Sequence, residues 1–424
     1  MRTAFKSDIG MSKTVFLSLV FAPDGVSTAI LMTELAQALQ HKGQQVVVIT
    51  TTPHYNMDVD ARARQPLEKR WGGLFYKSEL DGIEIYHVAM RPKGSRVISR
   101  IFDYLRFHIF STLIGLAIVK KGDVLFVPTP PLTIGVSAWL ISLFKRAPFI
   151  FNVQEIYPDL AVNMGVLTNK PLIWALEQLE MFTYWRSARI SVISERFRQQ
   201  LLKKGVRDHK IDIIPNFVDT SFIQPGARVN QFSAENNLNE KFVILYAGNI
   251  GLTQSFETVL EAAQNLTDIP DIQFVIVGDG TRRKWLEEQL ETQQLPNVLL
   301  LDYQPRSMVP CIYATSDLCV VPLKHSMAID TFPSKIYTIM AAARPVVAAA
   351  HPESELSDLV KRADCGWVVP PDDGEQLTAA IVEAHADKVA ARQKGQCGNL
   401  YVRSNYSKET VTEQYHQLLT RVGG

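Results

Sequence analysis

The residues best suited to chemistry lie in the second half of the chain, at Ser334 and Lys335. Pro333 precedes them, and residues 334–342 have the composition of a short helix. A helix N-terminus presents unpaired backbone N–H groups and the positive end of the helix dipole, and proline suits the first turn. The serine hydroxyl and the lysine charge add to this, so the stretch predicts a binding site for a phosphate or diphosphate. An ordinary strand–helix turn with a capping serine is the alternative.

Two further groups of candidate residues follow apolar, strand-like runs. Gln154 and Glu155 come directly after residues 149–153, and the turn Gly248-Asn249-Ile250-Gly251 comes after residues 242–247. Open α/β sheets place their active sites at the carboxyl ends of the strands, and glycines allow the backbone to approach a diphosphate closely. A purely structural hydrogen-bonding role for Glu155 is the alternative, and a G-x-x-G turn alone is a weak signal.

The elements around these residues alternate between strand and helix. Residues 14–20 are β-rich, 28–40 carry apolar residues at helical spacing, and 46–49 form the next strand, which predicts a parallel sheet. The same alternation resumes at residue 242, after a polar stretch at 224–240 that has the composition of an interdomain linker. With 424 residues, the chain has room for two domains with sizeable cores.

Three segments resemble family 4 glycosyltransferases of the GT-B fold. They are P-S-K-x-Y-x-x-M-A-A-x-x-P-V-V at 333–347, S-F-E-T-V-L-E-A-A at 255–263 and I-P-N-x-V-D at 214–219. The pattern is most similar to the bacterial polysaccharide subgroup of colanic-acid fucosyltransferase-like and N-acetylfucosamine transferase-like enzymes. The resemblance runs from about residue 14 to residue 420. It implies an α/β fold of two Rossmann-like domains that face each other across a central cleft.

The resemblance also implies domain boundaries and roles. The acceptor-side domain is expected at 1–220, joined by a C-terminal helix at 405–424, and the nucleotide-sugar domain at 221–404. The implied catalytic residues are Glu155 and Asp330. The implied donor-binding residues are Gly248, Asn249, Gly251, Arg283, Ser334, Lys335 and Thr338, and the acceptor-side residues are Gly25 and Gln154.

The chain departs from the family pattern at three positions. Thr338 stands where the family has the acid that contacts the ribose, and Thr253 stands where many relatives carry a lysine. Ala343 replaces a common glycine, which costs about 1–2 kcal/mol if the position needs the left-handed backbone conformation. Without the loop lysine, more of the phosphate charge is expected to fall on Lys335.

The activity implied is transfer of a hexosyl group, with retention of configuration and without a metal or other cofactor, from a UDP- or GDP-sugar. The acceptor would be a glycan or a polyprenyl-diphosphate-linked sugar in cell-surface polysaccharide synthesis. Two other functions stay open: a GT-B-like epimerase of nucleotide sugars, and a non-catalytic partner of another glycosyltransferase. Asp58-Val59-Asp60 matches the D-x-D of metal-dependent enzymes, but its polar surroundings indicate a solvated loop.

Charge and composition predict where the protein works. Residues 1–220 hold 27 Lys and Arg against 19 Asp and Glu, whereas the rest of the chain has a net charge of −7. Basic and aromatic residues alternate from Arg91 to Lys121, and no nucleic-acid motif accompanies them. The apolar run at 107–119 is too short to span a bilayer, which favours a core or interfacial helix. Four cysteines without metal spacing indicate free thiols. We therefore expect a cytoplasmic protein, attached peripherally to anionic lipid at the inner face of the plasma membrane.

Overall fold

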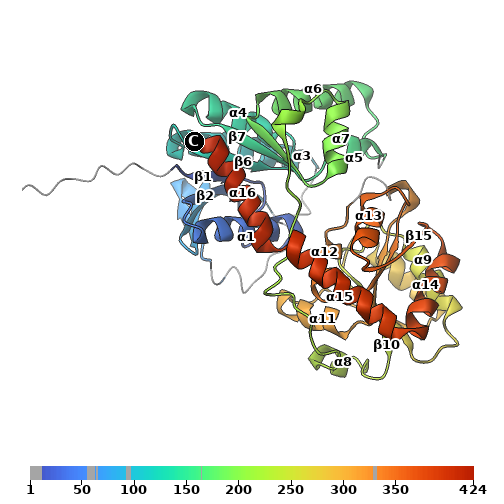
Figure 1. Ribbon diagram of the computed structural model, residues 1–424. Coiled ribbons are helices and arrows are strands. Elements are labelled where there is room, and N and C mark those ends of the chain that lie inside the picture. The colour runs from blue at the N-terminus through green and yellow to red at the C-terminus, as the bar shows by residue number, and fades with distance from the viewer. Residues whose placement is uncertain (1–11, 55–62, 64, 92–96, 164, 328–331) are drawn as a thin grey trace, which may run out of the picture. The chain divides into compact units, whose positions relative to one another are not determined.

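The computed structural model describes residues 12–54, 63, 65–91, 97–163, 165–327 and 332–424. The chain divides into two compact units, each with its own core (Figure 1). Unit 1 comprises residues 1–216 and 411–424, and unit 2 comprises residues 217–410. The corresponding boundaries expected from the sequence are 220 and 405. Each unit is an α/β layer structure, as the alternating pattern of strands and helices predicts.

Unit 1 is built on a nine-stranded sheet in the order β3-β4-β5-β2-β1-β6-β7-β8-β9. The strands from β5 to β9 in this order pair in parallel, and β3 and β4 add an antiparallel edge. The inner strands are apolar and fully buried, as expected of a parallel sheet covered on both faces. The strands are β1 (Thr14–Leu17), β2 (Val46–Thr51), β3 (Glu68–Arg70), β4 (Phe75–Leu80), β5 (Ile83–Val88), β6 (Val124–Pro128), β7 (Phe149–Val153), β8 (Arg189–Val192) and β9 (Ile211–Ile213).

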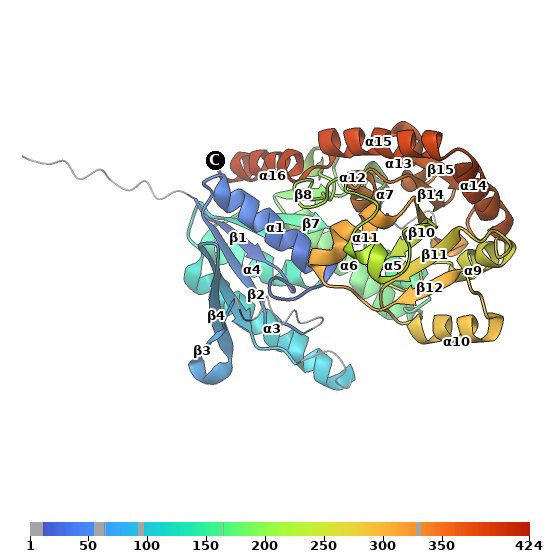
Figure 2. The same ribbon diagram turned by 90° about the horizontal axis from the view of Figure 1, so that it is seen from below.

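The helices of unit 1 cover both faces of this sheet. Figure 2 shows α1 and α16 on one side of the strands and α3 and α4 on the other. The helix at the end of the chain is held by Tyr415, whose ring meets Phe126 edge-on while its hydroxyl accepts a 3.0 Å hydrogen bond from Asn152. The helices are α1 (Ser27–His41), α3 (Val97–Ile118), α4 (Ile134–Lys145), α5 (Asp159–Asn163), α6 (Lys170–Arg186), α7 (Glu195–Lys203) and α16 (Lys408–Gly423). Unit 1 includes α16 from residue 411 onward.

Unit 2 has a fully parallel six-stranded sheet in the order β12-β11-β10-β13-β14-β15. Alternate residues of β10 enter two different cores, one on each face. The strands are β10 (Phe242–Ala247), β11 (Ile272–Val277), β12 (Val298–Leu301), β13 (Leu318–Pro322), β14 (Val346–Ala349) and β15 (Gly366–Val369). The helices are α8 (Gln231–Glu235), α9 (Phe256–Asn265), α10 (Arg283–Gln293), α11 (Val309–Thr315), α12 (Lys335–Ala341), α13 (Glu355–Arg362), α14 (Gly374–Ala386) and α15 (Lys388–Asn405).

The polar stretch at 224–240 is not an interdomain linker, so this expectation from the sequence is wrong. The stretch lies within unit 2 and contains α8, and a 2.9 Å ion pair between Arg228 and Asp317 ties it to the sheet. Its polar composition reflects side chains that bond to the backbone, such as the capping residue Asn230.

The apolar run at 107–119 belongs to a longer helix than expected. Because α3 begins at Val97, the stretch Arg100–Ile118 has the length and hydropathy of a membrane span, and it is the one stretch within the described residues that does. Its inner side nevertheless packs on α4, β2 and β5 within unit 1. The segment is therefore a surface helix of this unit, and only 22% of its apolar stretch is buried.

Candidate functional site

Lys335 is the first residue of α12, and its charged end is buried inside unit 2. The Nζ atom has no hydrogen-bond partner among the described residues, and it lies 3.7 Å from the centre of the Tyr246 ring. Burial lowers the pKa of the Lys335 ammonium to about 7. A buried cation without an anionic partner is costly, so this lysine is poised to gain stability from an anion that enters beside it.

The glycine turn after β10 lies directly beside this lysine. A Cβ atom placed on Gly248 would be 2.9 Å from Lys335 Nζ, so the absent side chain is what gives the amine room. The φ angle of Gly248 is +138°, which other residues rarely adopt. In the sequence these residues belong to two separate predicted phosphate-binding segments. The structure brings them together at the carboxyl edge of one sheet.

A second glycine turn fixes the first. A Cβ on Gly278 would fall 1.9 Å from the Gly248 carbonyl oxygen, so the two turns pack backbone to backbone. The amide of Ile250 donates to the Asp279 carbonyl at 2.8 Å, and the Ile250 carbonyl accepts from the Arg282 amide at 3.0 Å. These contacts preorganise the turn at 248–251 before any ligand arrives.

Tyr246 is a functional candidate that the sequence analysis missed. Its hydroxyl donates a 2.6 Å hydrogen bond to the Asn249 carbonyl, and its ring lies against the amine of Lys335. The residue therefore holds both the turn and the lysine. No sequence signal marks it, because a tyrosine in a buried strand is ordinary core composition.

The other predicted residues of this segment are Ser334 and Thr338. Ser334 is the N-cap residue; it is exposed, and its side chain makes no capping hydrogen bond. Its hydroxyl is therefore not used by the helix. Thr338 is half-buried one turn further along. Asp330, the predicted second catalytic residue, lies outside the described residues, as do Asp58 and Asp60.

The side chain of Arg283 is hydrogen-bonded to other residues of unit 2. Its guanidinium donates to the carbonyls of Gly278 and Leu301, both at 2.8 Å, and pairs with Glu287 at 2.7 Å and Asp302 at 2.9 Å. The side chain thus ties together the ends of β11 and β12. The predicted donor-binding role of Arg283 gains no support from this geometry.

A charged group on the same edge was not predicted. Arg282 forms two hydrogen bonds of 2.7 and 2.9 Å to Glu257, and Lys324 lies 3.5 Å from the same carboxylate. Burial alone would raise the pKa of Glu257, but the arginine and the lysine lower it to about 2. Glu257 is therefore ionised at neutral pH and paired with both Arg282 and Lys324.

In unit 1, Gln154 and Glu155 follow β7 as the sequence predicts. The Gln154 amide group donates to the Asn152 side chain at 2.7 Å, and its backbone N–H donates to Thr129 Oγ1 at 3.0 Å. Burial raises the pKa of Glu155, although a hydrogen bond from Tyr157 opposes the shift. A half-buried carboxyl group with a raised pKa at the carboxyl edge of a parallel sheet is a candidate for catalysis.

Gly25, the other predicted acceptor-side residue, lies in the loop after β1 beside a buried acid and a histidine. The carboxylate of Asp24 accepts the backbone N–H of His54 at 3.1 Å and lies 3.8 Å from His54 Nδ1. Burial lowers the pKa of His54. Asp24 and His54 are not among the predicted site residues, because residues 30 positions apart meet only when β1 and β2 pair.

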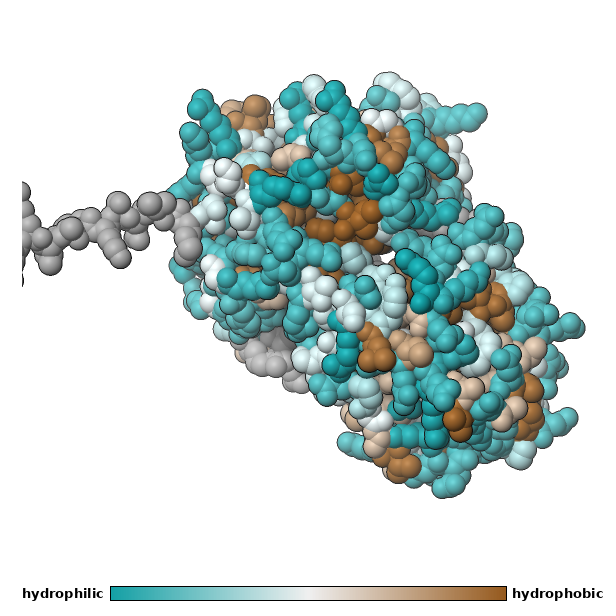
Figure 3. All heavy atoms as spheres, viewed as in Figure 1, coloured by the Kyte–Doolittle hydropathy of each residue, from teal (hydrophilic) through white to brown (hydrophobic). Residues whose placement is uncertain are grey.

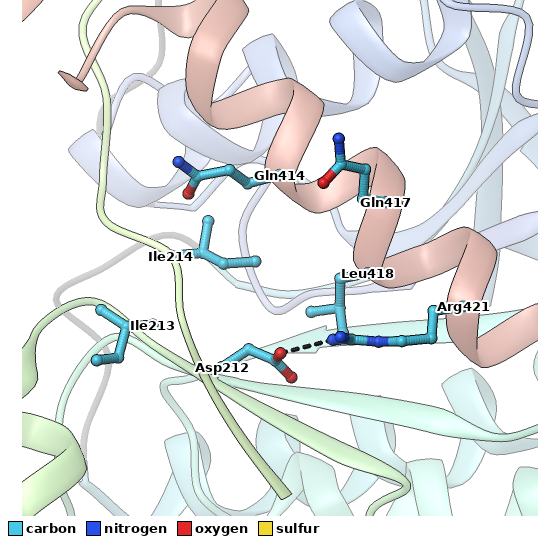
Figure 4. Close-up of a pocket in the computed structure, with 7 residues that line it drawn as sticks. All are labelled: Asp212, Ile213, Ile214, Gln414, Gln417, Leu418 and Arg421. Carbon is cyan, nitrogen blue, oxygen red and sulfur yellow. Dashed lines mark hydrogen bonds and ion pairs between the residues drawn. The ribbon is translucent and has the colours of Figure 1, made fainter. Parts of the chain in front are cut away.

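A cavity of about 310 Å³ in unit 1 involves a different set of residues. Figure 4 shows Arg421 of α16 pointing toward Asp212, to which it is bonded at 2.6 Å. Asp212 also holds Arg189 through two hydrogen bonds. Hydrophobic side chains reach the surface beside α16 (Figure 3). Ile213, which lines the cavity, is 41% exposed. We interpret this cavity as packing space under the terminal helix.

Two family models match the chain. Residues 25–216 match the model described as a glycosyl transferase 4-like domain, and residues 241–387 match the model described as glycosyl transferases group 1. The candidate phosphate-binding site of unit 2, formed by the 248–251 turn and Lys335, lies within the second match. The two matches follow the same division as the two units of the structure.

Curated relatives and solved structures resemble the chain over nearly all of its length or over about half of it. A putative colanic acid biosynthesis glycosyl transferase, WcaI of Escherichia coli K12, is 25% identical over 95% of this chain and 98% of its own. An Escherichia coli UDP-Gal:alpha-D-GlcNAc-diphosphoundecaprenol alpha-1,3-galactosyltransferase is 25% identical over 53% of this chain and 58% of its own. The crystal structure of HepE from Anabaena with UDP superposes with a TM-score of 0.71 at 14% identity, over 96% of this chain and 100% of its own.

Proposed function

The chain is a glycosyltransferase of the GT-B fold that acts in polysaccharide biosynthesis, and on this premise we propose that unit 2 binds the diphosphate of a nucleotide sugar beside Lys335. The observation that carries the proposal is the buried Nζ of Lys335, which has no hydrogen-bond partner among the described residues and faces the Gly248 turn. A diphosphate would supply the missing charge, and the N-terminus of α12 would add backbone donors.

The proposed reaction transfers a sugar from a UDP- or GDP-sugar with retention of anomeric configuration. As the bond to the diphosphate breaks, negative charge grows on the leaving oxygen. Lys335, Ser334 and the backbone of the 248–251 turn are the groups that would stabilise this charge, and no metal or other cofactor is invoked. Glu155 and Asp330 are proposed to act at the reacting sugar.

The proposed acceptor is a glycan or a sugar linked to a polyprenyl diphosphate. One relative is named for a diphosphoundecaprenol-linked acceptor, and another for colanic acid biosynthesis. An acceptor linked to a polyprenyl diphosphate is anchored in a membrane. The net charge of +8 on residues 1–220 would hold unit 1 at the anionic inner face of the plasma membrane, with the protein on the cytoplasmic side.

A thermal-stability screen tests the donor proposal. UDP-, GDP- and dTDP-sugars are added to the purified protein, and the unfolding temperature is measured. A nucleotide sugar present at 100 times its Kd should add about 2.7 kcal/mol to stability, and the same concentration of ligand should stabilise Lys335→Ala much less. If no nucleotide sugar stabilises the protein, the proposed donor site is wrong.

Product analysis tests the reaction itself. With the donor found in the screen and a synthetic lipid-diphosphate sugar as acceptor, NMR of the new glycosidic bond reports its configuration. Retention supports the proposal, and inversion contradicts it. Undiminished turnover in excess chelator would support a metal-independent reaction. A new nucleotide sugar formed without any acceptor would instead indicate an epimerase.

A further inference from the structure

Helix α3 has two faces of different character. Its inner face, made by Asp103, Phe107, Ser111 and Ile114, is buried against the rest of unit 1. These residues recur every three or four positions, which is the spacing of one helix face. We call the opposite side the outer face of α3. It carries five large apolar side chains that are 48–65% exposed, namely Ile101, Phe102, Leu105, Ile109 and Leu113.

The outer face lacks the polar side chains expected of a solvent-facing helix. Every residue classed as exposed between positions 101 and 117 is apolar. Arg106 turns toward Asp103, with 3.1 Å between their charged groups, so it does not interrupt the apolar surface with an isolated charge. An apolar patch of this kind usually marks an interaction site.

The neighbouring helix extends this surface. α4 packs against α3, and a Cβ at Gly115 would lie 2.4 Å from Ile141 Cδ1, so the two helices are in close contact. At the end of α4, Leu143 and Phe144 are 56% and 68% exposed. The apolar surface therefore continues from one helix to the next.

The charged residues that follow α3 and end α4 are positive. Lys120 and Lys121 follow α3, and Lys145 and Arg146 end α4. The one acidic residue in these two helices is Asp103, which is buried and paired with Arg106. Two helices that carry exposed apolar side chains, end in or are followed by basic residues and hold no exposed carboxylate are complementary to a bilayer of anionic lipid.

We propose that the outer face of α3, together with Leu143 and Phe144, inserts into the interfacial region of an anionic bilayer. This inference rests on the proposed membrane attachment of unit 1 and adds an apolar contact to it. Electrostatic attachment alone is screened by salt. Insertion of apolar side chains is not, because it depends on their removal from water.

Two other arrangements fit the surface less well. A symmetric dimer through this face would bring the same lysines and arginines of both copies together, which is unfavourable. A helix that crossed the membrane would lose its inner polar contacts, such as the 2.8 Å hydrogen bond between His108 Nε2 and Thr133 Oγ1. The helix is therefore proposed to lie along the membrane surface.

Vesicle flotation of the full-length protein tests the proposal. Vesicles of phosphatidylcholine alone, or with phosphatidylglycerol, are compared at low salt and at about 0.5 M salt, where the Debye length is only a few Å. The triple variant Ile101→Gln, Leu105→Gln, Ile109→Gln replaces exposed side chains of the outer face. The matched control is Val382→Gln, Val389→Gln, Leu400→Gln, which changes three exposed apolar residues of unit 2.

The wild type and the control should keep most of their binding to anionic vesicles at high salt, whereas the triple variant should lose at least tenfold in partition coefficient. The tryptophan fluorescence of the Phe102→Trp variant should be quenched by brominated lipid more strongly than that of the wild type. All variants should keep their unfolding temperature and their stabilisation by a nucleotide sugar, which separates this test from that of the donor site. Equal binding by the triple variant and the wild type would overturn the proposal. So would a wild-type dimer that the triple variant converts to monomer.

Discussion

The Nζ of Lys335 lies 3.7 Å from the centre of the Tyr246 ring, with no hydrogen-bond acceptor in reach among the described residues. The aromatic face gives the amine a weak electrostatic partner. It does not replace the water that burial removes, and this is why the pKa of Lys335 falls to about 7. The pair thus holds a cation in a position where an incoming diphosphate would interact with it strongly.

Lys335→Ala should weaken binding of the nucleotide sugar about 10- to 150-fold, since a hydrogen bond to a charged group contributes about 1.5–3 kcal/mol. Lys335→Met is the matched variant, because it keeps an apolar stem of similar length and should lose as much. Isothermal titration calorimetry gives both values. Unchanged affinity in the two variants would remove Lys335 from the donor site.

Binding of the nucleotide sugar should take up protons above pH 7. In the free protein the pKa of Lys335 is about 7, so the amine loses its proton as pH rises through that value. A bound diphosphate favours the charged form and raises the pKa again. Proton uptake should therefore be small at about pH 6 and approach one per ligand by about pH 8.5. Calorimetry in buffers of different ionisation enthalpy measures it, and Lys335→Met should show none.

The same shift affects folding. The pKa of an unfolded lysine is about 10.4, so between pH 7 and that value the unfolded chain binds more protons than the folded one. The stability of the ligand-free wild type should therefore rise with pH across this window relative to that of Lys335→Met. Urea unfolding at two pH values checks the sign, and a parallel course of both proteins would contradict it.

Tyr246 offers a test of how the turn is held. Tyr246→Phe keeps the ring beside Lys335 but removes the 2.6 Å hydrogen bond to the Asn249 carbonyl, which is worth about 1 kcal/mol. Affinity for the nucleotide sugar should fall by about fivefold, and proton uptake should remain. Tyr246→Leu removes the ring as well and should change proton uptake too. If Tyr246→Phe binds as tightly as the wild type, the hydrogen bond does not position the turn.

Much of this architecture could be predicted from local sequence. The strands at residues 149–153 and 242–247 have the bounds expected from their apolar pattern. The position of Lys335 at the start of α12 follows from Pro333 and the strand before it. Its burial against Tyr246 does not, because that contact depends on how β10 and α12 pack.

The features that sequence could not predict arise from contacts between distant segments. Asp24 meets His54 through the pairing of two strands, and Arg283 is occupied by the ends of two others. The full length of α3 was also missed, because the apolar pattern of residues 107–119 gave no sign of the helical turns before it. Patterns along the chain report periodicity, whereas these roles depend on tertiary packing.

Glu155→Gln should reduce kcat by about 100-fold if the reaction uses the ionised carboxylate, since the amide keeps the shape and removes the charge. Burial raises the pKa of this carboxyl group, so activity of the wild type should fall at low pH earlier than for an ordinary glutamate. The acidic limb of the kcat/KM profile should be absent in Glu155→Gln. Full activity of the variant, with unchanged pH dependence, would assign Glu155 a structural role.

Ala343→Gly should stabilise the protein. Ala343 follows α12 with a φ angle of +54°, a left-handed conformation that costs an alanine about 1–2 kcal/mol. The gain should be about 1 kcal/mol, because glycine also makes the unfolded chain more flexible. The preceding Ala342 has φ of −76° and is fully buried, so Ala342→Gly should instead destabilise by a similar amount. Urea unfolding of both variants gives the two signs, and a loss of stability in Ala343→Gly would show that packing of the Ala343 methyl group outweighs the backbone strain.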